Sequence, residues 1–245
     1  MLADVRVEIC VESVGGVRVA EEAGADRIEL CGGLSDGGLT PSLALIEFAV
    51  ARTVKTQVHV LIRPRAGDFH YSADEISLMV RDIQAARAAG ADGVVVGALD
   101  LAGALDPINK AFVAAAEGLE VTLHRAIDVS ASSQRALDQA VAFGFARVLT
   151  SGRQRSALEG AAVIKDLVRQ AAGAIEVMAG GGIRPSNVSE VIGATGVSAV
   201  HAAVRTPVPG AADLFAGVGV PQGFDRFDTG PAEAAALCEL VRGRH

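Results

Sequence analysis

The sequence predicts an α/β protein, a single (β/α)8 TIM barrel with a C-terminal extension after the eighth strand. Eight short apolar runs recur along the chain, and a helix-like stretch follows each of them. The polar residues of the runs gather at one end of each run, as expected for a barrel with a reactive mouth. The length of 245 residues matches the roughly 250 typical of one such barrel. The predicted strands are Val5–Cys10, Arg27–Cys31, Gln57–Arg63, Gly93–Gly97, Glu120–His124, Arg147–Ser151, Ile175–Gly180 and Ser198–Ala202.

Capping residues and glycine stops predict the helix boundaries. A serine or aspartate side chain caps the first turn of a helix, and a glycine commonly follows the last turn. The predicted helices run from Ser13 through Ala23 to a stop at Gly24, from Ser72 or Asp74 to Gly90, and from Ser132 or Ser133 to a stop near Gly144.

The whole chain, residues 1–245, is predicted to form one domain. The barrel covers about residues 5–205, and the extension covers residues 206–245. A Gly- and Pro-rich connection from Pro207 to Pro231 precedes a last helix from Ala232 to Val241. We expect this extension to pack across the barrel or to form a contact between subunits.

Charge and composition argue against several classes of partner. The formal net charge is -7 and no basic run is present, so neither nucleic acid nor an anionic membrane is an expected partner. No apolar run approaches the roughly 20 residues of a membrane-spanning helix, and the first residues do not resemble a signal peptide. The three cysteines are expected to be free thiols. These features predict a cytoplasmic protein.

Alternation along the strands predicts a polar barrel interior. In the first strand Val7 and Ile9 share one face, while Glu8 and Cys10 share the other. Because the surrounding helices need an apolar surface, the polar set must face inward. Buried charges persist only when paired, so we expect a closed ion-pair network at the lower end of the interior. Its predicted members are Arg6, Arg27, Glu120, Arg147 and Glu176.

The upper end of the interior combines carboxylates, an imidazole and a guanidinium where strands end and βα loops begin, which is where such barrels place their active sites. These groups suit proton transfer beside an anionic or enediol-like intermediate. Alternatively, Glu8, Glu29 and Arg63 extend the ion-pair network upward. An aspartate shortly after a histidine can orient it or hold an arginine. The candidate catalytic residues are Glu8, Glu29, Arg63, His124 and Asp128.

Other residues near the strand ends are candidates for ligand binding. Arg65 and Arg63 in "IRPRAGDF" suit a carboxylate or phosphate, although Arg65 alone equally fits a solvated loop. The run "MAGGGIRPSNV" resembles the phosphate loop of many barrels, but its glycines equally suit close packing of loop on strand. The candidate ligand-binding residues are Arg65, Ser151, Gly180, Gly181, Gly182 and His201.

Some chemistries lack the residues they need. Lys55, Lys110 and Lys165 lie before a strand or within helices, so no strand-borne amine is available for a Schiff base. The sequence also lacks GxSxG, HExxH and Walker motifs and a closely spaced histidine pair for zinc.

Several segments fall in the order and spacing of the CutC family, among them "DRIELCGGLSDGGLTPS", "HVLIRPRAGDFHYS", "TLHRAIDV" and "MAGGGIRPSNV". The chain resembles this family from about Val5 to Val204. The resemblance implies a cytosolic (β/α)8 barrel associated with copper homeostasis, usually a homo-oligomer such as a dimer or tetramer. It also implies copper(I) binding by the cysteines that close the first two strands, here Cys10 and Cys31. The chain departs from the family at strand eight, where Ala202 and Ala203 replace serines.

Two functional hypotheses follow. In the first, the chain is a copper(I)-binding homeostasis protein. Adjacent strands lie about 4.8 Å apart, so two inward thiols at equivalent heights suit a soft ion. In the second, it is a metal-independent lyase or isomerase acting on a small polyhydroxylated or anionic substrate at the barrel mouth. The alternative for Cys10 and Cys31 is the commoner fate of free cysteine, that of a small buried apolar residue. The expected partner is a small-molecule ligand or a copper ion, and the sequence leaves open whether the protein is an enzyme.

Overall fold

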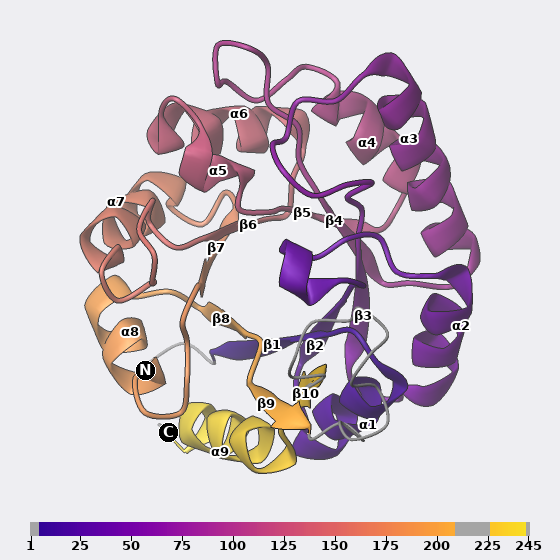
Figure 1. Ribbon diagram of the computed structural model, residues 1–245. Helices are drawn as coiled ribbons and strands as arrows, with labels where there is room; N and C mark the ends of the chain where they lie inside the picture. The colour runs from indigo at the N-terminus through magenta and orange to yellow at the C-terminus, as the bar shows by residue number, and fades with distance from the viewer. Residues whose placement is uncertain (1–4, 209–225, 244–245) are drawn as a thin grey trace, which may run out of the picture.

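The computed structural model describes residues 5–208 and 226–243, and its centre is a closed barrel of eight strands (Figure 1). Neighbouring strands are parallel and follow chain order, and β8 closes the barrel by pairing with β1. The predicted α/β barrel is therefore confirmed, with strand ends that differ from the predicted ones by at most two residues. The strands are β1 (Arg6–Val11), β2 (Arg27–Leu30), β3 (Gln57–Leu61), β4 (Gly93–Val96), β5 (Glu120–Leu123), β6 (Arg147–Thr150), β7 (Glu176–Gly180) and β8 (Ala199–Ala202).

Helices surround the barrel as an outer ring (Figure 1). A short 3-10 turn, η1 (Leu34–Asp36), instead lies over the centre of the barrel in this view. The helices of the ring are α1 (Val14–Ala23), α2 (Leu43–Arg52), α3 (Ala73–Ala88), α4 (Asn109–Ala116), α5 (Ala126–Val129), α6 (Ser133–Phe143), α7 (Ala161–Ala171), α8 (Val188–Thr195) and α9 (Pro231–Arg242).

The predicted caps are present, and the structure decides between the alternatives. Ser13 caps α1 by accepting a hydrogen bond from the Gly16 amide, and Gly24 ends that helix in the left-handed region. Ser72 rather than Asp74 caps α3, through a capping box with Glu75. In α6, Ser132 is the cap and the following serine is the first helical residue.

The lower end of the barrel holds an ion-pair network with four of the five predicted members. Glu176 pairs with both Arg6 and Arg147, and Arg147 also donates to Glu120 at 2.9 Å. Arg6 was expected inside the barrel, but its side chain is 44% exposed because β1 begins at the open rim.

Arg27 stands outside this network, which corrects the prediction that it belongs there. The register of β1 and β2 places Arg27 beside Glu8, and the two form a salt bridge with almost no exposure to solvent. His59 on β3 is fully buried beside them. Burial and the charge of Arg27 lower the pKa of His59 to about 3, so its imidazole is neutral.

The C-terminal extension completes the outer wall. β9 (Arg205–Val208) pairs antiparallel with β10 (Arg226–Thr229), and α9 then packs between α1 and α8 (Figure 1). The predicted last helix is thus confirmed, one residue longer at each end. Most of the predicted connection from Pro207 to Pro231 lies outside the described residues.

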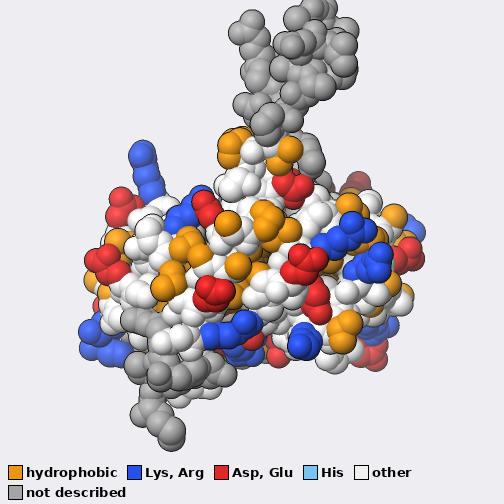
Figure 2. All heavy atoms as spheres, turned by 90° about the horizontal axis from the view of Figure 1, so that it is seen from below, with side chains coloured by type: hydrophobic (Ala, Val, Ile, Leu, Met, Phe, Trp, Pro, Cys, Tyr) orange, Lys and Arg blue, Asp and Glu red, His pale blue; other side chains and the backbone are white. Residues whose placement is uncertain are grey.

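The surface carries charges of both signs. Figure 2 shows acidic and basic side chains interspersed with apolar ones on the face that carries α1 and α9, without a large patch of one sign. Among the helices described, none is long and apolar enough to cross a membrane.

We expect the ion pairs of Glu176 to make the stability of the barrel depend on pH. Burial favours the neutral acid, but Arg147 outweighs it and lowers the pKa of Glu176 from the ordinary 4.5. Such a group stabilises the fold fully above its unfolded pKa and loses this contribution as the pH falls through its folded pKa. Glu176→Gln should therefore lower the unfolding free energy at neutral pH by about 1–3 kcal/mol, between the values for surface and buried pairs.

Urea unfolding at neutral and strongly acidic pH measures this effect. The difference between wild type and Glu176→Gln should shrink at acidic pH, where Glu176 is protonated. Glu22→Gln, at an exposed position of α1, serves as the control. A pH-independent difference would contradict the assignment.

Candidate functional site

A cavity of about 490 Å³ opens at the carboxyl ends of the strands. The ends of β1, β2 and β8 contribute Cys10, Glu29 and His201 to its lining. The turn after β2 contributes Leu34, and the loops after other strands contribute Phe69, Ile183 and three guanidinium groups, those of Arg63, Arg125 and Arg184. The predicted location of the site at the barrel mouth thus coincides with a cavity large enough for a small molecule.

His201 lies between two carboxyl groups, with a hydrogen bond to Glu8 and a longer contact with Glu29. Glu8 is fully buried, and although burial opposes its charge, Arg27 and His201 hold its pKa well below the usual range. Glu8 is therefore a carboxylate, and His201 Nδ1 donates to its Oε1 at 2.7 Å. The other ring nitrogen, Nε2, lies 3.8 Å from Glu29 Oε2. The structure thus brings together Glu8, Glu29 and His201, which sequence reasoning assigned to two different roles.

The pKa values of Glu29 and His201 shift in the direction that suits proton exchange. Burial raises the pKa of Glu29. Burial opposes the charged form of His201, but Glu29 and the hydrogen bond to Glu8 outweigh it and raise the pKa of His201. A carboxyl and an imidazole with raised pKa values in one cleft are typical of acid–base sites.

The two candidate metal-binding cysteines are adjacent. Cys10 Sγ and Cys31 Sγ are 3.5 Å apart, and both residues are buried. The Cys10 thiol donates a hydrogen bond to Glu29 Oε2 at 3.1 Å. Its contact with Cys31 and its burial raise the pKa of Cys10 well above its usual value. Cys238 is also free and buried, but it lies on α9, outside the barrel.

His124 borders the cavity as a neutral imidazole. Burial and the nearby charge of Arg63 lower its pKa to about 3. The Ala126 amide donates to Nδ1 at 3.2 Å, so the proton of the neutral ring is on Nε2. Nε2 has no hydrogen-bond partner within the described ranges. A Cβ on Gly97 would lie 2.9 Å from the ring, so glycine at this position gives the imidazole its room.

Arg63 lines the cavity, but its terminal N–H groups donate hydrogen bonds to main-chain carbonyls of the protein. Its Nη1 donates to the carbonyls of Asp36 and Gly38, and its Nη2 donates to the carbonyl of Gly67. The guanidinium also stacks over Phe69, 5.3 Å from the ring centroid. Arg63 thereby joins η1 to the loop after β3.

Arg65 does not join Arg63 in the cavity lining. Its Nε donates to Glu75 at 2.6 Å, and its Nη2 donates to Asp68. The side chain also stacks over Tyr71, 5.2 Å from the ring centroid. Its geometry therefore matches the alternative of a loop residue that is partly solvated.

Asp128 positions the loop after β6. Its carboxylate accepts hydrogen bonds from the amides of Ser151 and Arg153 and from the hydroxyl of Thr150. It also binds the guanidinium of Arg125 at 2.9 Å. Of the two roles predicted for Asp128, its contacts match the holding of an arginine. Ser151 supports the same guanidinium, because its hydroxyl accepts from Arg125 at 2.6 Å, and it does not line the cavity.

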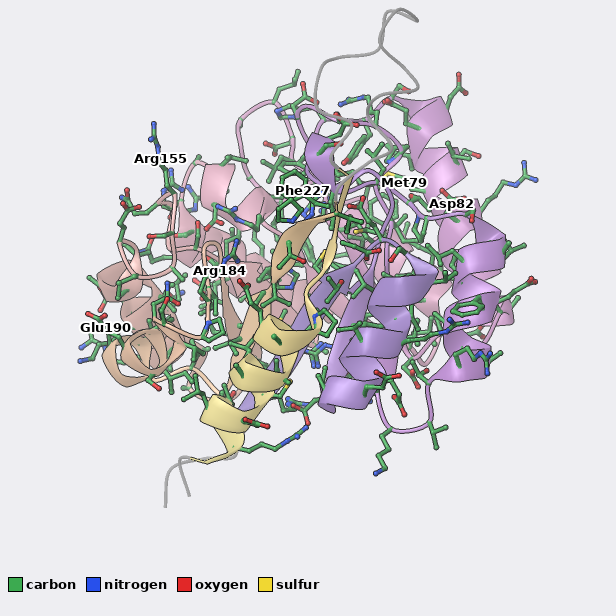
Figure 3. The ribbon with its side chains drawn as sticks, turned by 60° about the horizontal axis from the view of Figure 1, so that its bottom comes forward. Met79, Asp82, Arg155, Arg184, Glu190 and Phe227 are labelled. Carbon is green, nitrogen blue, oxygen red and sulfur yellow. The ribbon has the colours of Figure 1, made fainter. Side chains whose placement is uncertain are left out.

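The glycines after β7 divide into two groups. Gly180 packs against β6, since a Cβ there would lie 2.5 Å from Leu149 Cδ1, and it does not line the cavity. Gly181 and Gly182 have positive φ angles of 104° and 69° and do line it. Arg184 follows them and also lines the cavity, whereas Arg155 projects away from the barrel (Figure 3).

Sequence reasoning did not single out Leu34, Phe69 or Arg184, although all three line the cavity. Phe69 and Arg184 lie in loops and Leu34 in the short turn η1, where no periodic pattern marks a side chain as inward. The only available signal for Arg184 was its place next to the glycine run.

Comparisons with known proteins match most of the chain. The CutC family model matches residues 5–206. A CutC family protein of Xanthomonas campestris pv. campestris (strain B100) is 48% identical over 203 residues, which cover 82% of this chain and 84% of the relative. A CutC family protein of Bacteroides thetaiotaomicron is 42% identical over 202 residues, which cover 82% of this chain and 81% of that relative.

Solved structures agree with these matches. A crystal structure of the protein described as copper homeostasis protein CutC from Streptococcus agalactiae has a TM-score of 0.77 and 33% identity, and the match covers 81% of this chain and 98% of that one. Phosphoribosylanthranilate isomerase of Thermotoga maritima, at 14% identity and a TM-score of 0.59, shares the fold alone. From the family match and the relatives alike, the chain belongs to the CutC family.

Proposed function

We propose that the barrel mouth binds a small anionic or polyhydroxylated molecule and catalyses a proton-transfer reaction on it, as a lyase or isomerase that needs no metal. The observation that carries this proposal is the 490 Å³ cavity, in which Glu29 and His201 share one space with three guanidinium groups. A site for a bare metal ion has no need of such a volume or of these cations.

The chemistry follows from the protonation states of the groups at the cavity. Glu29 removes a proton from a carbon next to a carbonyl, because its raised pKa makes it a better base than an ordinary carboxylate. His201, held by Glu8, returns a proton as the general acid. Because Nδ1 is fixed by Glu8, the proton that His201 delivers comes from Nε2.

The guanidinium groups at the cavity favour a substrate with an anionic group. Arg125 lies at the end of β5, which the strand order places across the barrel from β1. Arg184 Nη1 donates to the carbonyl of Ile183, and its other side-chain nitrogens have no hydrogen-bond partner among the described residues. A substrate with its anionic group near Arg125 and Arg184 therefore extends its reacting carbon toward Glu29.

Solvent deuterium exchange tests this proposal. Sugar phosphates, aldonates and 2-oxo acids are incubated with the protein in D2O, and loss of the C–H signal is followed by NMR. At least one of these classes should exchange, and Glu29→Gln should slow the exchange by about 10²–10⁴-fold, the usual contribution of a general base. Arg184→Ala should mainly raise KM.

Two surface variants serve as controls for this experiment. Glu190→Gln on α8 and Arg155→Ala make the same kinds of substitution at positions away from the cavity (Figure 3). Both should exchange like the wild type. Equal rates for wild type and Glu29→Gln on an exchanging substrate would contradict the role of Glu29.

Copper(I) binding at the thiol pair is a second candidate function, and a separate observation favours it. The sulfurs of Cys10 and Cys31 are 3.5 Å apart and sheltered from solvent, and thiolates are the ligands that a soft ion prefers. The donor set fits copper(I), and the two cysteines would hold the ion as cargo. A linear arrangement needs sulfurs roughly 4.6 Å apart if the bonds are as long as zinc–thiolate bonds, so the thiols must separate on binding.

Titration of the reduced protein with copper(I) against a chromophoric chelator tests this second candidate. We expect one equivalent per chain and its loss in both Cys10→Ser and Cys31→Ser, because each variant leaves a single thiol. Cys238→Ser is the matched control and should bind normally. Unchanged affinity in the variant lacking both mouth cysteines would refute the site.

We further propose that the protein works in the cytoplasm as a homo-oligomer. The three free thiols support a reducing compartment. The apolar side chains of Val14 and Phe227 are about half exposed on α1 and β10, two elements in contact, and offer an apolar surface for a second copy. Light scattering should give a mass of at least a dimer of the 25.0 kDa chain. A concentration-independent monomer mass would contradict self-association.

A further inference from the structure

We propose that Cys10, Glu29 and His201 form a site for a borderline divalent metal ion such as zinc, which shares Cys10 with the thiol pair but does not use Cys31. One donor atom of each residue lies within 4.8 Å of the donors of the other two. The three residues belong to β1, to β2 and to β8, which are neighbours in the closed barrel. No spacing in the sequence marks them as ligands, because His201 is far from the other two along the chain.

The spacing of the donors suits tetrahedral coordination. Zinc bonds of about 2.0–2.3 Å at tetrahedral angles place the ligand atoms roughly 3.3–3.8 Å from one another. Cys10 Sγ and Glu29 Oε2 are 3.1 Å apart, and Glu29 Oε2 and His201 Nε2 are 3.8 Å apart. The third pair, Cys10 and His201, lies within 4.8 Å, so closing all three pairs on one ion requires side-chain shifts of up to roughly 1 Å. The mixture of thiolate, carboxylate and imidazole is typical of ligands for zinc.

Glu8 supplies the supporting contact that metal-binding histidines require. A histidine that binds a metal through one nitrogen commonly donates the other N–H to a carboxylate, which fixes the ring. His201 Nδ1 donates to Glu8, so Nε2 is the nitrogen directed at Glu29. Arg27 neutralises Glu8 from the other side, so Glu8 itself is not available as a ligand.

The three ligands leave one side of the ion open to the cavity. Cys10, Glu29 and His201 all line the mouth, and the His201 side chain is 14% exposed. An ion held by three residues with an open fourth position resembles catalytic rather than structural zinc sites. Here Glu29 and His201 are also the groups proposed to move protons, so a bound ion withdraws both from that reaction.

Zinc binding to the reduced, tag-free protein, measured by calorimetry, tests the site. We expect one zinc ion per chain. Replacement of a ligand, in Cys10→Ser, Glu29→Gln or His201→Gln, should weaken binding by more than the 10–100-fold expected for a supporting contact, and Glu8→Gln should fall in that range. Cobalt(II) should give a thiolate charge-transfer band that Cys10→Ser removes. Thermal unfolding shows whether each variant is folded. Where a ligand variant does not fold, the test is made on the wild type instead: zinc should displace cobalt(II) and remove the charge-transfer band.

The variants separate this site from both proposed functions. Cys31→Ser should retain zinc and lose copper(I), whereas His201→Gln should lose zinc and retain copper(I). Cys238→Ser should retain both. The inference is overturned if zinc does not bind, if binding survives in His201→Gln and Glu29→Gln, or if it requires Cys31 instead. Because zinc binding needs no substrate, this result is independent of the deuterium exchange experiment. If exchange occurs, zinc should abolish it in the wild type.

Discussion

The burial of the Glu8 carboxylate is the constraint on which the rest of the mouth depends. A charge with no exposure to solvent persists only with compensating partners, and removing one partner of such a pair typically costs about 3–5 kcal/mol. Arg27 provides one partner from β2 and His201 provides the other from β8. The three strands are thus tied together at the level where the cavity begins. Through His201 the same carboxylate determines which nitrogen faces Glu29 and, together with Glu29, raises the pKa of the imidazole.

The strands, the helix caps and the location of the site could be predicted because they depend on local patterns. Alternation identified the inward residues, and serine and glycine marked the helix ends, as Ser13 and Gly24 show for α1. The partner of Arg27 could not be predicted in the same way. It depends on the register between β1 and β2, which only the closed barrel fixes.

Loop residues account for most of what sequence reasoning missed at the site. Arg65 turns toward Glu75 at the start of α3, although its neighbour in the motif faces the cavity. Asp128 follows His124 closely in the chain, yet its carboxylate serves the loop after β6. In both cases hydrogen-bond partners come from another element, so the sequence identified the residue but not its role. The cysteines were placed correctly at the ends of adjacent strands, although Cys31 lies one residue past β2, whereas the contact of Cys10 with Glu29 depends on side-chain conformation.

The hydrogen bonds from Arg63 to main-chain carbonyls leave the side chains of η1 free to vary in evolution. Arg63 holds η1 over the mouth through the carbonyls of Asp36 and Gly38, so it recognises main-chain atoms rather than side chains. Mutations in the side chains of this turn therefore leave its attachment intact. Leu34 faces the cavity from the turn and packs against the cluster that includes Cys10, Cys31 and Leu61, so a change in its size alters the cavity while the hydrogen bonds of Arg63 remain. Selection for a new ligand thus has a position at which it can act while the barrel and its buried charges stay the same.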